Sequence, residues 1–435
     1  MIKSKKIKTR FAPSPTGFLH VGGLRTALYN FLFARQKGGS FILRIEDTDR
    51  VRIAEGAEEN ILETLKLFGL IFDEGPFKQS ERLEKYRAYC DELLKKELAY
   101  KDADAVRFKM EKKGTTKFTD IIRGEIEIEN KLQEDFIILK SDGFPTYNLA
   151  HLIDDHEMGI THVIRGEEFI SSMPKYLALH SAFGWAPPEY AHLPLLLNKN
   201  RTKLSKREGD LAVLDYLNQG YLKEALLNFV ALLGWHPSGS EKEIFSLEEL
   251  ISDFKLENVQ KAGAIFDLEK LDWMNGEYIR TKPLDELVAL SKPFMKDFLQ
   301  FSIFNFQFPK ILKLEQFRLK KLSDLPELTN YFFKEPEYDK ELLRWKKMKD
   351  DEIVNSLGTA KFVLQSVSEN DFTKENLEKL FLESAKNFAD RGELLWPLRA
   401  ALTGKKASPG PFEIMEILGK NNSISRLSTA ISMLK

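Results

Sequence analysis

Short apolar runs and longer amphipathic segments alternate along the first third of the chain. Strand-like segments lie at 7–12 and 41–47, and helical segments are predicted at 23–36 and 55–69. A strand, a helix and a second strand at this spacing predict a βαβ unit, and therefore a parallel sheet with right-handed crossovers. Because ligands bind such sheets beyond the carboxyl ends of their strands, the turn after residue 12 is a candidate binding site.

The pattern changes at two further points. Short β-like pieces between 101 and 135 indicate an insertion between two halves of a sheet. Sheet-like segments return at 136–140 and 161–166, with a helix predicted at 146–157. Beyond residue 211 the chain is almost entirely helical. One helix there is predicted from apolar residues at helical spacing, namely Leu222, Ala225, Leu226, Phe229, Val230 and Leu233. The sequence therefore predicts an α/β region followed by an all-α region.

Composition narrows the class of protein. At 435 residues the chain is too long for one core, so we expect several domains. A net charge of −1 gives no overall positive field for nucleic acid, so any such binding depends on local clusters. The single Cys90 excludes disulfides and multi-cysteine zinc sites, and it suits a reducing cytoplasm. We expect no membrane segment, because the most apolar run, 221–235, is short and amphipathic.

The stretch 17-GFLHVGGLRTAL-28 places a histidine and two glycines at a predicted helix start. A capping or core histidine is the ordinary interpretation of such a residue. The functional interpretation is a nucleotide site, because helix N-termini attract phosphate through unpaired N–H groups and the helix dipole. Gly22 and Gly23 would let a base or ribose approach the backbone, and His20 would donate a hydrogen bond to a phosphoryl oxygen.

A second candidate is the basic stretch 199-KNRTKLSKREGD-210, which holds five cations within nine residues. Charge runs of this kind usually form a solvated loop. The functional interpretation is a polyphosphate clamp, in which Lys203 and Lys206 meet pyrophosphate as point charges and Ser205 donates a hydrogen bond.

The two stretches together resemble the HIGH and KMSKS signatures of class I aminoacyl-tRNA synthetases. Four segments narrow the resemblance to the glutamyl-tRNA synthetase family: 10-RFAPSPTGFLHVGGLRTAL-28, 44-RIEDTDR-50, 145-PTYNLAHLIDDH-156 and 161-THVIRGEE-168. The segments 265-IFDLEKLDWMNGEYIR-280 and 395-LWPLRAALTGKKASPGPFE-413 agree with it, so the resemblance covers nearly the whole chain. HVGG and EDTD favour glutamate over glutamine, whose synthetases usually show a second histidine and a DDTN-type turn.

The resemblance implies a Rossmann-like parallel-sheet catalytic domain with a short inserted α+β subdomain, followed by helical stem-contact and anticodon-binding domains. The expected boundaries are 1–100 for the first half of the catalytic domain, 101–135 for the acceptor-binding insertion, 136–210 for the second half with the KLSKR loop, 211–280 for the stem-contact domain and 281–435 for the anticodon-binding domain. The insertion is shortened, because several dozen residues that the family usually carries are missing within 100-YKDADAVR-107.

The resemblance also implies site residues. The expected ATP-binding set is Thr16, Gly17, His20, Gly22, Gly23, Lys203, Leu204, Ser205 and Lys206, of which His20, Lys203 and Lys206 would be catalytic. Leu204 replaces the usual Met, which conserves volume. The expected glutamate-binding set is Arg10, Ala12, Ser14, Glu46, Tyr147, His151 and Arg165.

Within the glutamate-binding set, the chemistry of each residue suggests a role. A pocket for glutamate needs arginines, because a guanidinium binds carboxylate in a planar fork. Arg10 and Arg165 fall at predicted strand ends that face one crevice, and the resemblance assigns Arg10 with Tyr147 to the side-chain carboxylate and Arg165 to the other. Glu46 would bind the ammonium group, helped by Ala12 and Ser14 on the entry strand.

Other interpretations of these residues stay open at this point. A strand-end arginine is often a surface ion pair, and Tyr147 can simply pack. Glu46, Asp47 and Asp49 can form a capping turn or a cation site. Metal-ligand spacing on one helical face is also found, at His151, Asp154, Asp155 and His156. The family reads this helix as part of the substrate pocket, so Mg²⁺ with ATP is the only metal that we expect, and no zinc.

The function that follows is a glutamate–tRNA ligase, which forms glutamyl-adenylate from ATP and L-glutamate and transfers the glutamyl group to tRNA(Glu). Two alternatives remain: an enzyme that also charges tRNA(Gln), and an inactive RNA-binding paralogue. We expect a cytoplasmic monomer whose helical C-terminal region binds the anticodon.

Overall fold

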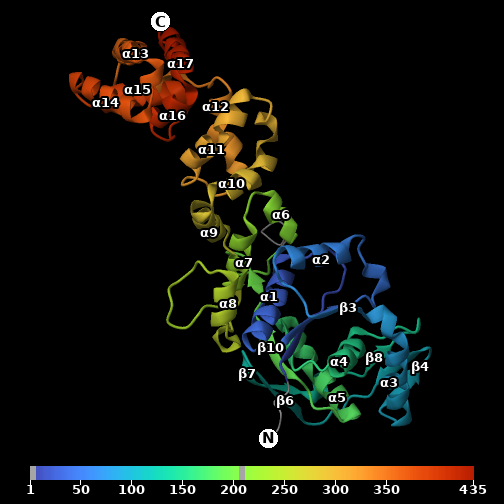
Figure 1. Ribbon diagram of the computed structural model, residues 1–435. Coiled ribbons are helices and arrows are strands. Elements are labelled where there is room, and N and C mark those ends of the chain that lie inside the picture. Colours follow the sequence, from blue (N-terminus) through green and yellow to red (C-terminus); the bar gives the residue numbers. More distant parts are fainter. Residues whose placement is uncertain (1–5, 205–210) are drawn as a thin grey trace. The chain divides into compact units, whose positions relative to one another are not determined.

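The computed structural model of the chain describes residues 6–204 and 211–435 (Figure 1). The chain divides into two compact units, residues 1–274 and 275–435, and the second unit is entirely helical in its described part. The strands of the first unit are β1 (Lys8–Phe11), β2 (Ser40–Ile45), β3 (Glu74–Lys78), β4 (Ala99–Asp102), β5 (Ala105–Phe108), β6 (Thr115–Asp120), β7 (Gly124–Glu129), β8 (Phe136–Leu139), β9 (His162–Gly166), β10 (Glu189–Leu193), β11 (Leu196–Leu197) and β12 (Ala264–Ile265).

The helices confirm the expected order of an α/β region and an all-α region. Those of the first unit are α1 (Val21–Gln36), α2 (Ala57–Leu67), α3 (Leu83–Lys95), α4 (Tyr147–Glu157), α5 (Met173–Phe183), α6 (Val213–Asn218), α7 (Lys223–Ala231) and α8 (Leu247–Asp253). Helix α9 (Leu268–Thr281) spans the division between the units. The second unit continues with α10 (Leu284–Ser291), α11 (Ser302–Glu315), α12 (Leu325–Phe333), α13 (Asp350–Ser366), α14 (Lys374–Ser384), α15 (Gly392–Thr403), α16 (Pro411–Leu418) and α17 (Lys420–Met433).

The parallel strands form two sheets that meet between β1 and β9. Strands β1, β2 and β3 pair in parallel, and β9, β10 and β6 pair in parallel in the second sheet. Thr161, just before β9, exchanges backbone and side-chain hydrogen bonds with Lys8 of β1. The spatial order is therefore β3-β2-β1-β9-β10-β6, with the chain reversing its direction of travel across the sheet at β1. Such a reversal opens a crevice at the carboxyl ends of the central strands.

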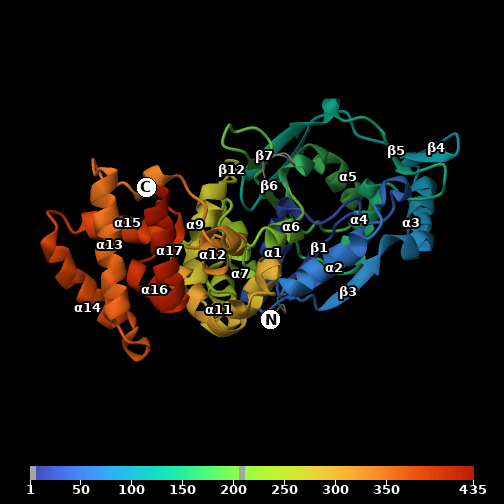
Figure 2. The ribbon, with the colours of Figure 1, turned by 90° about the horizontal axis from the view of Figure 1, so that it is seen from above.

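Both faces of the central strands are covered, as expected for a parallel sheet. Phe41 of β2 makes an edge contact with Phe31 of α1, and His162 of β9 packs on Phe33 of the same helix. The neighbouring positions Ile42 and Val163 belong instead to a core shared with α3, α4 and α5. Helices α4 and α5 lie side by side in both views (Figures 1 and 2). Side chains in register with Ile42 therefore point toward α4.

The segment 101–135 differs from the inserted subdomain that the sequence predicts. Its strands β4 and β5 join an antiparallel sheet with β8, whereas β6 pairs with β10 and carries the hairpin partner β7. Its one helical element is a 3₁₀ turn at Asn130–Leu132. A segment this short cannot bury a core of its own, and two-stranded hairpins are marginal alone, so its strands extend sheets made by the rest of the unit.

Element positions match the sequence pattern closely, with two kinds of difference. Helix α1 begins at Val21, two residues earlier than predicted, and β2 ends at Ile45. Strands β3, β4, β10, β11 and β12 and helices α3 and α5 were not predicted. The amphipathic helix at 221–235 is confirmed as α7, and all six of its apolar positions are buried. The four boundaries between the five predicted segments stay predictions, because a division at 274/275 tests none of them directly.

Candidate active site

Three arginines point from the parallel strands toward α4. Arg10 of β1 is in register with Ile42, Arg44 lies two residues further along β2, and Arg165 occupies the corresponding part of β9. All three are buried, with exposed fractions of 4%, 0% and 5%. Burying a guanidinium is costly unless it is paired, so the partners of these three side chains define what the crevice can bind.

Arg10 and Arg44 share the carboxylate of Asp155 on α4. The Arg10 Nε and Arg44 Nη1 atoms lie 3.0 and 2.8 Å from Asp155 Oδ1. Burial alone would raise the pKa of Asp155, but these two cations lower it well below its usual range. The Nη groups of Arg10 have no hydrogen-bond partner within the described residues, so they remain for a ligand.

Glu46 follows β2 and is held by Arg44. Its Oε1 atom accepts hydrogen bonds from Arg44 Nη2 at 2.9 Å and Nε at 3.2 Å. Burial raises the pKa of Glu46, and Arg44 opposes that rise. The second oxygen, Oε2, has no hydrogen-bond partner in the described part of the chain. A substrate ammonium group is a suitable partner for it.

Arg165 differs from the other two arginines, because no carboxylate of the described residues pairs with it. Its Nε–H faces His192 Nε2 at 3.3 Å, Nη1 lies 3.5 Å from the Tyr147 hydroxyl and Nη2 lies 3.2 Å from the Met173 sulfur. The rings of Tyr176 and Phe169 lie under the guanidinium at 4.7 and 4.8 Å. The positive charge is therefore buried among neutral groups, and a substrate carboxylate would complete it.

Tyr147 and His151 lie one turn apart at the start of α4. Their rings stack at 4.4 Å, and His151 Nδ1 lies 2.6 Å from the Tyr147 carbonyl oxygen. Burial, together with Arg165, lowers the pKa of His151 well below 6.5, so the ring is neutral at neutral pH. Because a carbonyl oxygen only accepts, Nδ1 carries the proton and Nε2 is left as an acceptor.

The turn after β1 lies over the same strand ends. Ser14 Oγ donates to the Glu46 carbonyl oxygen at 2.7 Å, and Glu46 N donates to the Pro13 carbonyl oxygen at 2.9 Å. Ala12 is half-buried, whereas Ser14, Thr16 and Gly17 are exposed. These bonds join the turn to the backbone of Glu46, the residue that Ala12 and Ser14 were expected to assist.

The packing of neighbouring side chains requires small residues at both glycines of HVGG. A Cβ at Gly22 would lie 3.0 Å from Cε1 of the His20 ring, and a Cβ at Gly23 would lie 2.6 Å from Leu19. The His20 imidazole thus folds back over the start of α1, where the exposed ring meets the helix N-terminus. Both glycines were expected to let a nucleotide approach the backbone; in the structure Gly22 also makes room for the His20 ring.

The described ends of the basic stretch have defined positions in the first unit. Lys203 bridges Leu197 of β11, and Leu204 N donates to the Leu196 carbonyl oxygen at 3.1 Å. On the far side of the loop, Ala212 bridges His20. Lys203 is exposed and Leu204 is buried, while Ser205 and Lys206 lie outside the described residues. Of the described residues on either side of 205–210, Lys203 and Leu204 therefore lie against β11, and Ala212 lies beside His20.

The metal-site interpretation of α4 is wrong. Asp154 accepts hydrogen bonds from Gln79, Arg82 and Tyr86, Asp155 is the partner of two arginines, and His156 stacks on Trp185 at 3.8 Å. Among the residues that the structure describes, no group of three or more His, Cys, Asp or Glu side chains could hold a metal ion. Helical spacing alone placed these four side chains together, but tertiary packing gives each a different partner.

Two parts of the site were missed from the sequence. Arg44 was quoted within a motif but received no role, although it organises the whole charge network. Asp120 and His192 form the second omission, with Asp120 Oδ2 lying 2.7 Å from His192 Nδ1. The single charge inside the apolar run 41-FILRI-45 was a usable signal for Arg44, because a strand buried on both faces hosts a cation only with partners.

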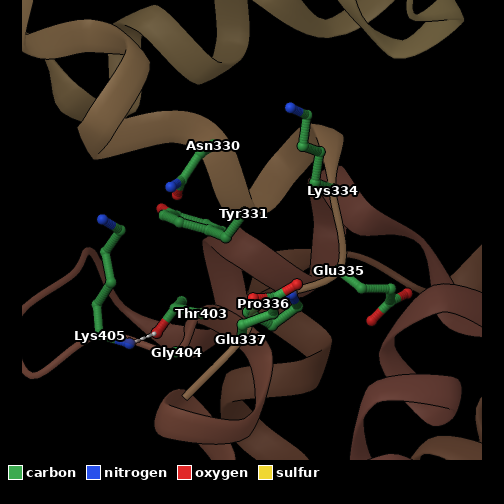
Figure 3. Close-up of a pocket in the computed structure, with 9 residues that line it drawn as sticks. All are labelled: Asn330, Tyr331, Lys334, Glu335, Pro336, Glu337, Thr403, Gly404 and Lys405. Carbon is green, nitrogen blue, oxygen red and sulfur yellow. Dashed lines mark hydrogen bonds between the residues drawn. The ribbon is translucent and has the colours of Figure 1, made fainter.

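The helical unit contains a separate cavity of about 300 Å³. It is lined by Asn330, Tyr331, Lys334, Glu335, Pro336, Glu337, Thr403, Gly404 and Lys405. Figure 3 shows the polar ends of Asn330, Tyr331 and Lys405 gathered at one edge of this cavity. The lining combines two lysines with two glutamates, so it offers both hydrogen-bond donors and acceptors.

The fold and the paired motifs define the class: a class I tRNA synthetase. The model of the catalytic domain of class I tRNA synthetases (E and Q) matches residues 6–105 and 102–273, and an anticodon binding domain model matches residues 280–431. The two catalytic matches meet where the family residues were predicted to be missing. There, β4 and β5 are joined through Ala103 and Asp104 alone.

The chain belongs to the glutamate–tRNA ligase family. It is 43% identical to the glutamate–tRNA ligase of Clostridium kluyveri over 484 aligned positions, which cover 99% of this chain and 98% of the relative. The glutamate–tRNA ligase of Clostridium tetani is 42% identical, with 100% and 99% covered. The crystal structure of a glutamate tRNA ligase from Elizabethkingia meningosepticum in complex with its amino acid superposes with a TM-score of 0.89 at 34% identity, covering 99% of this chain and 100% of that one.

Among the described helices, none has both the length and the apolar character of a membrane span.

Proposed function

We propose that the protein activates L-glutamate with ATP and transfers the glutamyl group to the 3′ end of tRNA(Glu). The observation that carries this proposal is Arg165, a buried cation with no carboxylate partner among the described residues. A substrate carboxylate beside Arg165 and Tyr147, a second near the free Nη groups of Arg10, and an ammonium group at Glu46 would satisfy three groups at once. An α-amino acid with an acidic side chain offers all three.

In the first step, an oxygen of the glutamate α-carboxylate attacks the α-phosphorus of ATP and pyrophosphate leaves with the electrons of the broken P–O bond. No general base is needed, because the carboxylate is already ionised, so catalysis rests on positioning and charge stabilisation. His20 donates a hydrogen bond to the phosphoryl oxygens as charge builds on them. Lys203 and Lys206 stabilise the departing pyrophosphate.

In the second step, a hydroxyl of the terminal ribose of tRNA attacks the carbonyl carbon of glutamyl-adenylate and AMP leaves. Mg²⁺ would arrive with the phosphates of ATP and neutralise part of their charge. The family match over 280–431 supports anticodon binding by the helical unit. In that unit the cavity beside Lys405 could accept an unstacked base, whose edge would find both donors and acceptors.

The test measures attachment of labelled glutamate to tRNA(Glu) and tRNA(Gln) in parallel. We expect the wild-type protein to charge tRNA(Glu), and Arg165→Met to raise the KM for glutamate by about a hundredfold, as for loss of a charge-assisted pair. Arg35→Met is the matched control, because Arg35 pairs with Asp73 at the surface. Charging of neither tRNA by folded wild-type protein would contradict the proposal and favour an inactive RNA-binding paralogue.

Charging of both tRNAs would favour the alternative of a non-discriminating enzyme. Lys206→Ala separates the remaining alternative, since an enzyme would lose activation while keeping affinity for tRNA, and an idle binder would have no activation to lose. Cytoplasmic location, a monomeric state and the absence of zinc stay predictions.

A further inference from the structure

We propose that Asp120 and His192 are positioning residues, which hold the Arg165 guanidinium in the orientation that receives a carboxylate of the amino-acid substrate. This inference rests on the proposed function, and it adds a specificity element from outside the recognised motifs. Asp120 ends β6, in the segment predicted as a shortened insertion, and His192 lies on β10.

The three side chains form one line of hydrogen bonds. His192 and Arg165 are direct partners in the parallel pairing of β10 with β9, so both point from the same face of the sheet. Arg165 Nε lies 3.3 Å from His192 Nε2, and His192 Nδ1 lies 2.7 Å from Asp120 Oδ2. The three residues are 5%, 0% and 1% exposed, which excludes exchange of partners with bulk water.

The hydrogen bonds of Asp120 fix its protonation state. Oδ1 accepts from the backbone N–H groups of Ile122 and Arg123 at 3.0 and 2.9 Å. Oδ2 accepts from the backbone N–H of His192 at 3.1 Å in addition to the ring. A carboxylate that accepts four hydrogen bonds is ionised, and although burial opposes it, the His192 contacts keep the pKa of Asp120 below its usual value.

An ionised Asp120 in turn fixes the tautomer of His192. Because Oδ2 can only accept, Nδ1 must carry the proton. Burial lowers the pKa of His192, so the ring is neutral and its Nε2 atom bears a lone pair. Nε2 therefore accepts the Nε–H of Arg165, while Nη1 is turned toward the Tyr147 hydroxyl and Nη2 toward the Met173 sulfur.

The aromatic rings around Arg165 hold its plane but do not set its rotation. Tyr176, Phe169 and Tyr190 lie within 5.5 Å of the guanidinium carbon, and stacking leaves the cation free to turn over a ring face. Two direct contacts oppose this rotation, from Nε to His192 Nε2 at 3.3 Å and from Nη2 to the Met173 sulfur at 3.2 Å, and of the two acceptors the imidazole nitrogen is the stronger. The hydrogen bonds from Asp120 through His192 thus determine which N–H groups of Arg165 face the substrate.

The decisive test compares two substitutions of one residue. In His192→Gln, the side-chain oxygen replaces Nε2 and can still accept from Arg165. In His192→Asn, the shorter amide keeps a donor near Asp120 but withdraws the acceptor from Arg165. Positioning predicts that His192→Asn raises the KM for glutamate on the order of tenfold, whereas His192→Gln stays within about threefold of wild type. The KM for ATP and the kcat at saturating glutamate should stay within about twofold in both variants.

His162→Asn is the matched control. His162 belongs to the same sheet, but it packs against Phe33 of α1 on the opposite face, so its loss should leave the KM for glutamate unchanged. Equal KM values for His192→Asn and His192→Gln, whether raised or not, would overturn the inference. They would mean that His192 only fills space and that its hydrogen bond to Arg165 has no effect on glutamate binding. A rise confined to His192→Gln would overturn it as well.

A second measurement tests the role of Asp120. Asp120→Asn can donate to Nδ1 and move the ring proton to Nε2, where it would oppose the Arg165 N–H, so the KM for glutamate should again rise on the order of tenfold. The same change should add little in a His192→Gln background, since glutamine has no tautomer to be set. If the effects of Asp120→Asn and His192→Gln on the KM for glutamate were fully additive, Asp120 would not act through His192, which would contradict the inference. If wild-type protein charges no tRNA(Glu), the proposed function fails instead, so the two failures are distinguishable.

Discussion

Replacement of Arg44 by methionine is the sharpest test of the charge network. The side chain is fully buried and donates hydrogen bonds to two carboxylates, at 2.9 and 3.2 Å to Glu46 and 2.8 Å to Asp155, and its Nε lies 3.7 Å from a third, Asp154. Asp155 keeps Arg10, but Glu46 loses both of its hydrogen bonds to a cation. Breaking one partner of a buried pair costs about 3–5 kcal/mol, because the remaining charge is uncompensated.

A surface pair calibrates this magnitude. Arg35 donates to Asp73 at 2.7 Å, yet both side chains are partly exposed, so Arg35→Met should cost about 0–1 kcal/mol. The free energy of unfolding is best read from urea-dependent hydrogen exchange in β2 and α4, because the two units of the chain need not unfold together. The double variant Arg44→Met with Glu46→Gln should recover about half of the loss, since the stranded charge is gone.

The loss should also depend on pH. Burial already raises the pKa of Glu46, and without Arg44 only the charge of Arg10 opposes that rise, so the carboxyl is more easily protonated. The cost of Arg44→Met should therefore shrink as pH falls from neutral toward about pH 5, because a neutral Glu46 needs no cation. A loss no larger than that of Arg35→Met, or one that grows on acidification, would refute the reasoning.

Three further outcomes are expected. Gly22→Ala should lower the rate of glutamate-dependent ATP–pyrophosphate exchange by about tenfold or more without destabilising the protein, because the new Cβ displaces the His20 ring from 3.0 Å away; an unchanged rate would contradict this role. Burial lowers the pKa of His180 to about 4, so the stability it confers is complete above pH 6.5 and falls by about 2 kcal/mol by pH 5; urea unfolding of His180→Leu should lack this component, and parallel pH curves would count against it. Gly358→Ala, on an exposed position of α13 with open space around it, should stabilise the helical unit by roughly 0.5–1 kcal/mol in thermal unfolding, and a lowered Tm would exclude that assignment.

Local patterns predicted the elements that carry the site. Apolar runs located β1, β2, β8 and β9, and the turn chemistry placed HVGG at the start of α1. Because the carboxyl ends of parallel strands share one edge of the sheet, Arg10 and Arg165 were expected to face one crevice, whereas the resemblance added Glu46; in the structure all three are buried at the ends of β1, β2 and β9. Their roles toward glutamate stay a proposal.

Contacts between residues that are distant in the sequence could not be predicted from local patterns. Asp120 and His192 meet only because β6 joins the edge of β10, a pairing across 72 residues that no local pattern encodes. Arg44 was overlooked because a cation inside a strand suggests a solvent-facing position, whereas its partners come from α4 and the end of its own strand. Tertiary context decides such positions, since a buried charge is stable only where the fold brings counter-charges to it.

The tight connection between β4 and β5 has a practical consequence for building on this scaffold. Asp102 and Ala105 are paired directly, and Ala103 adopts a left-handed backbone with φ of 50° to close the turn. A longer segment inserted there would start and end at neighbouring residues of the β4–β5 pair. The entropic cost of closing it as a loop therefore rises only slowly with its length. The turn between β4 and β5 is thus a suitable insertion site for fused reporters or grafted domains. An insertion there would leave the crevice and its arginines unchanged.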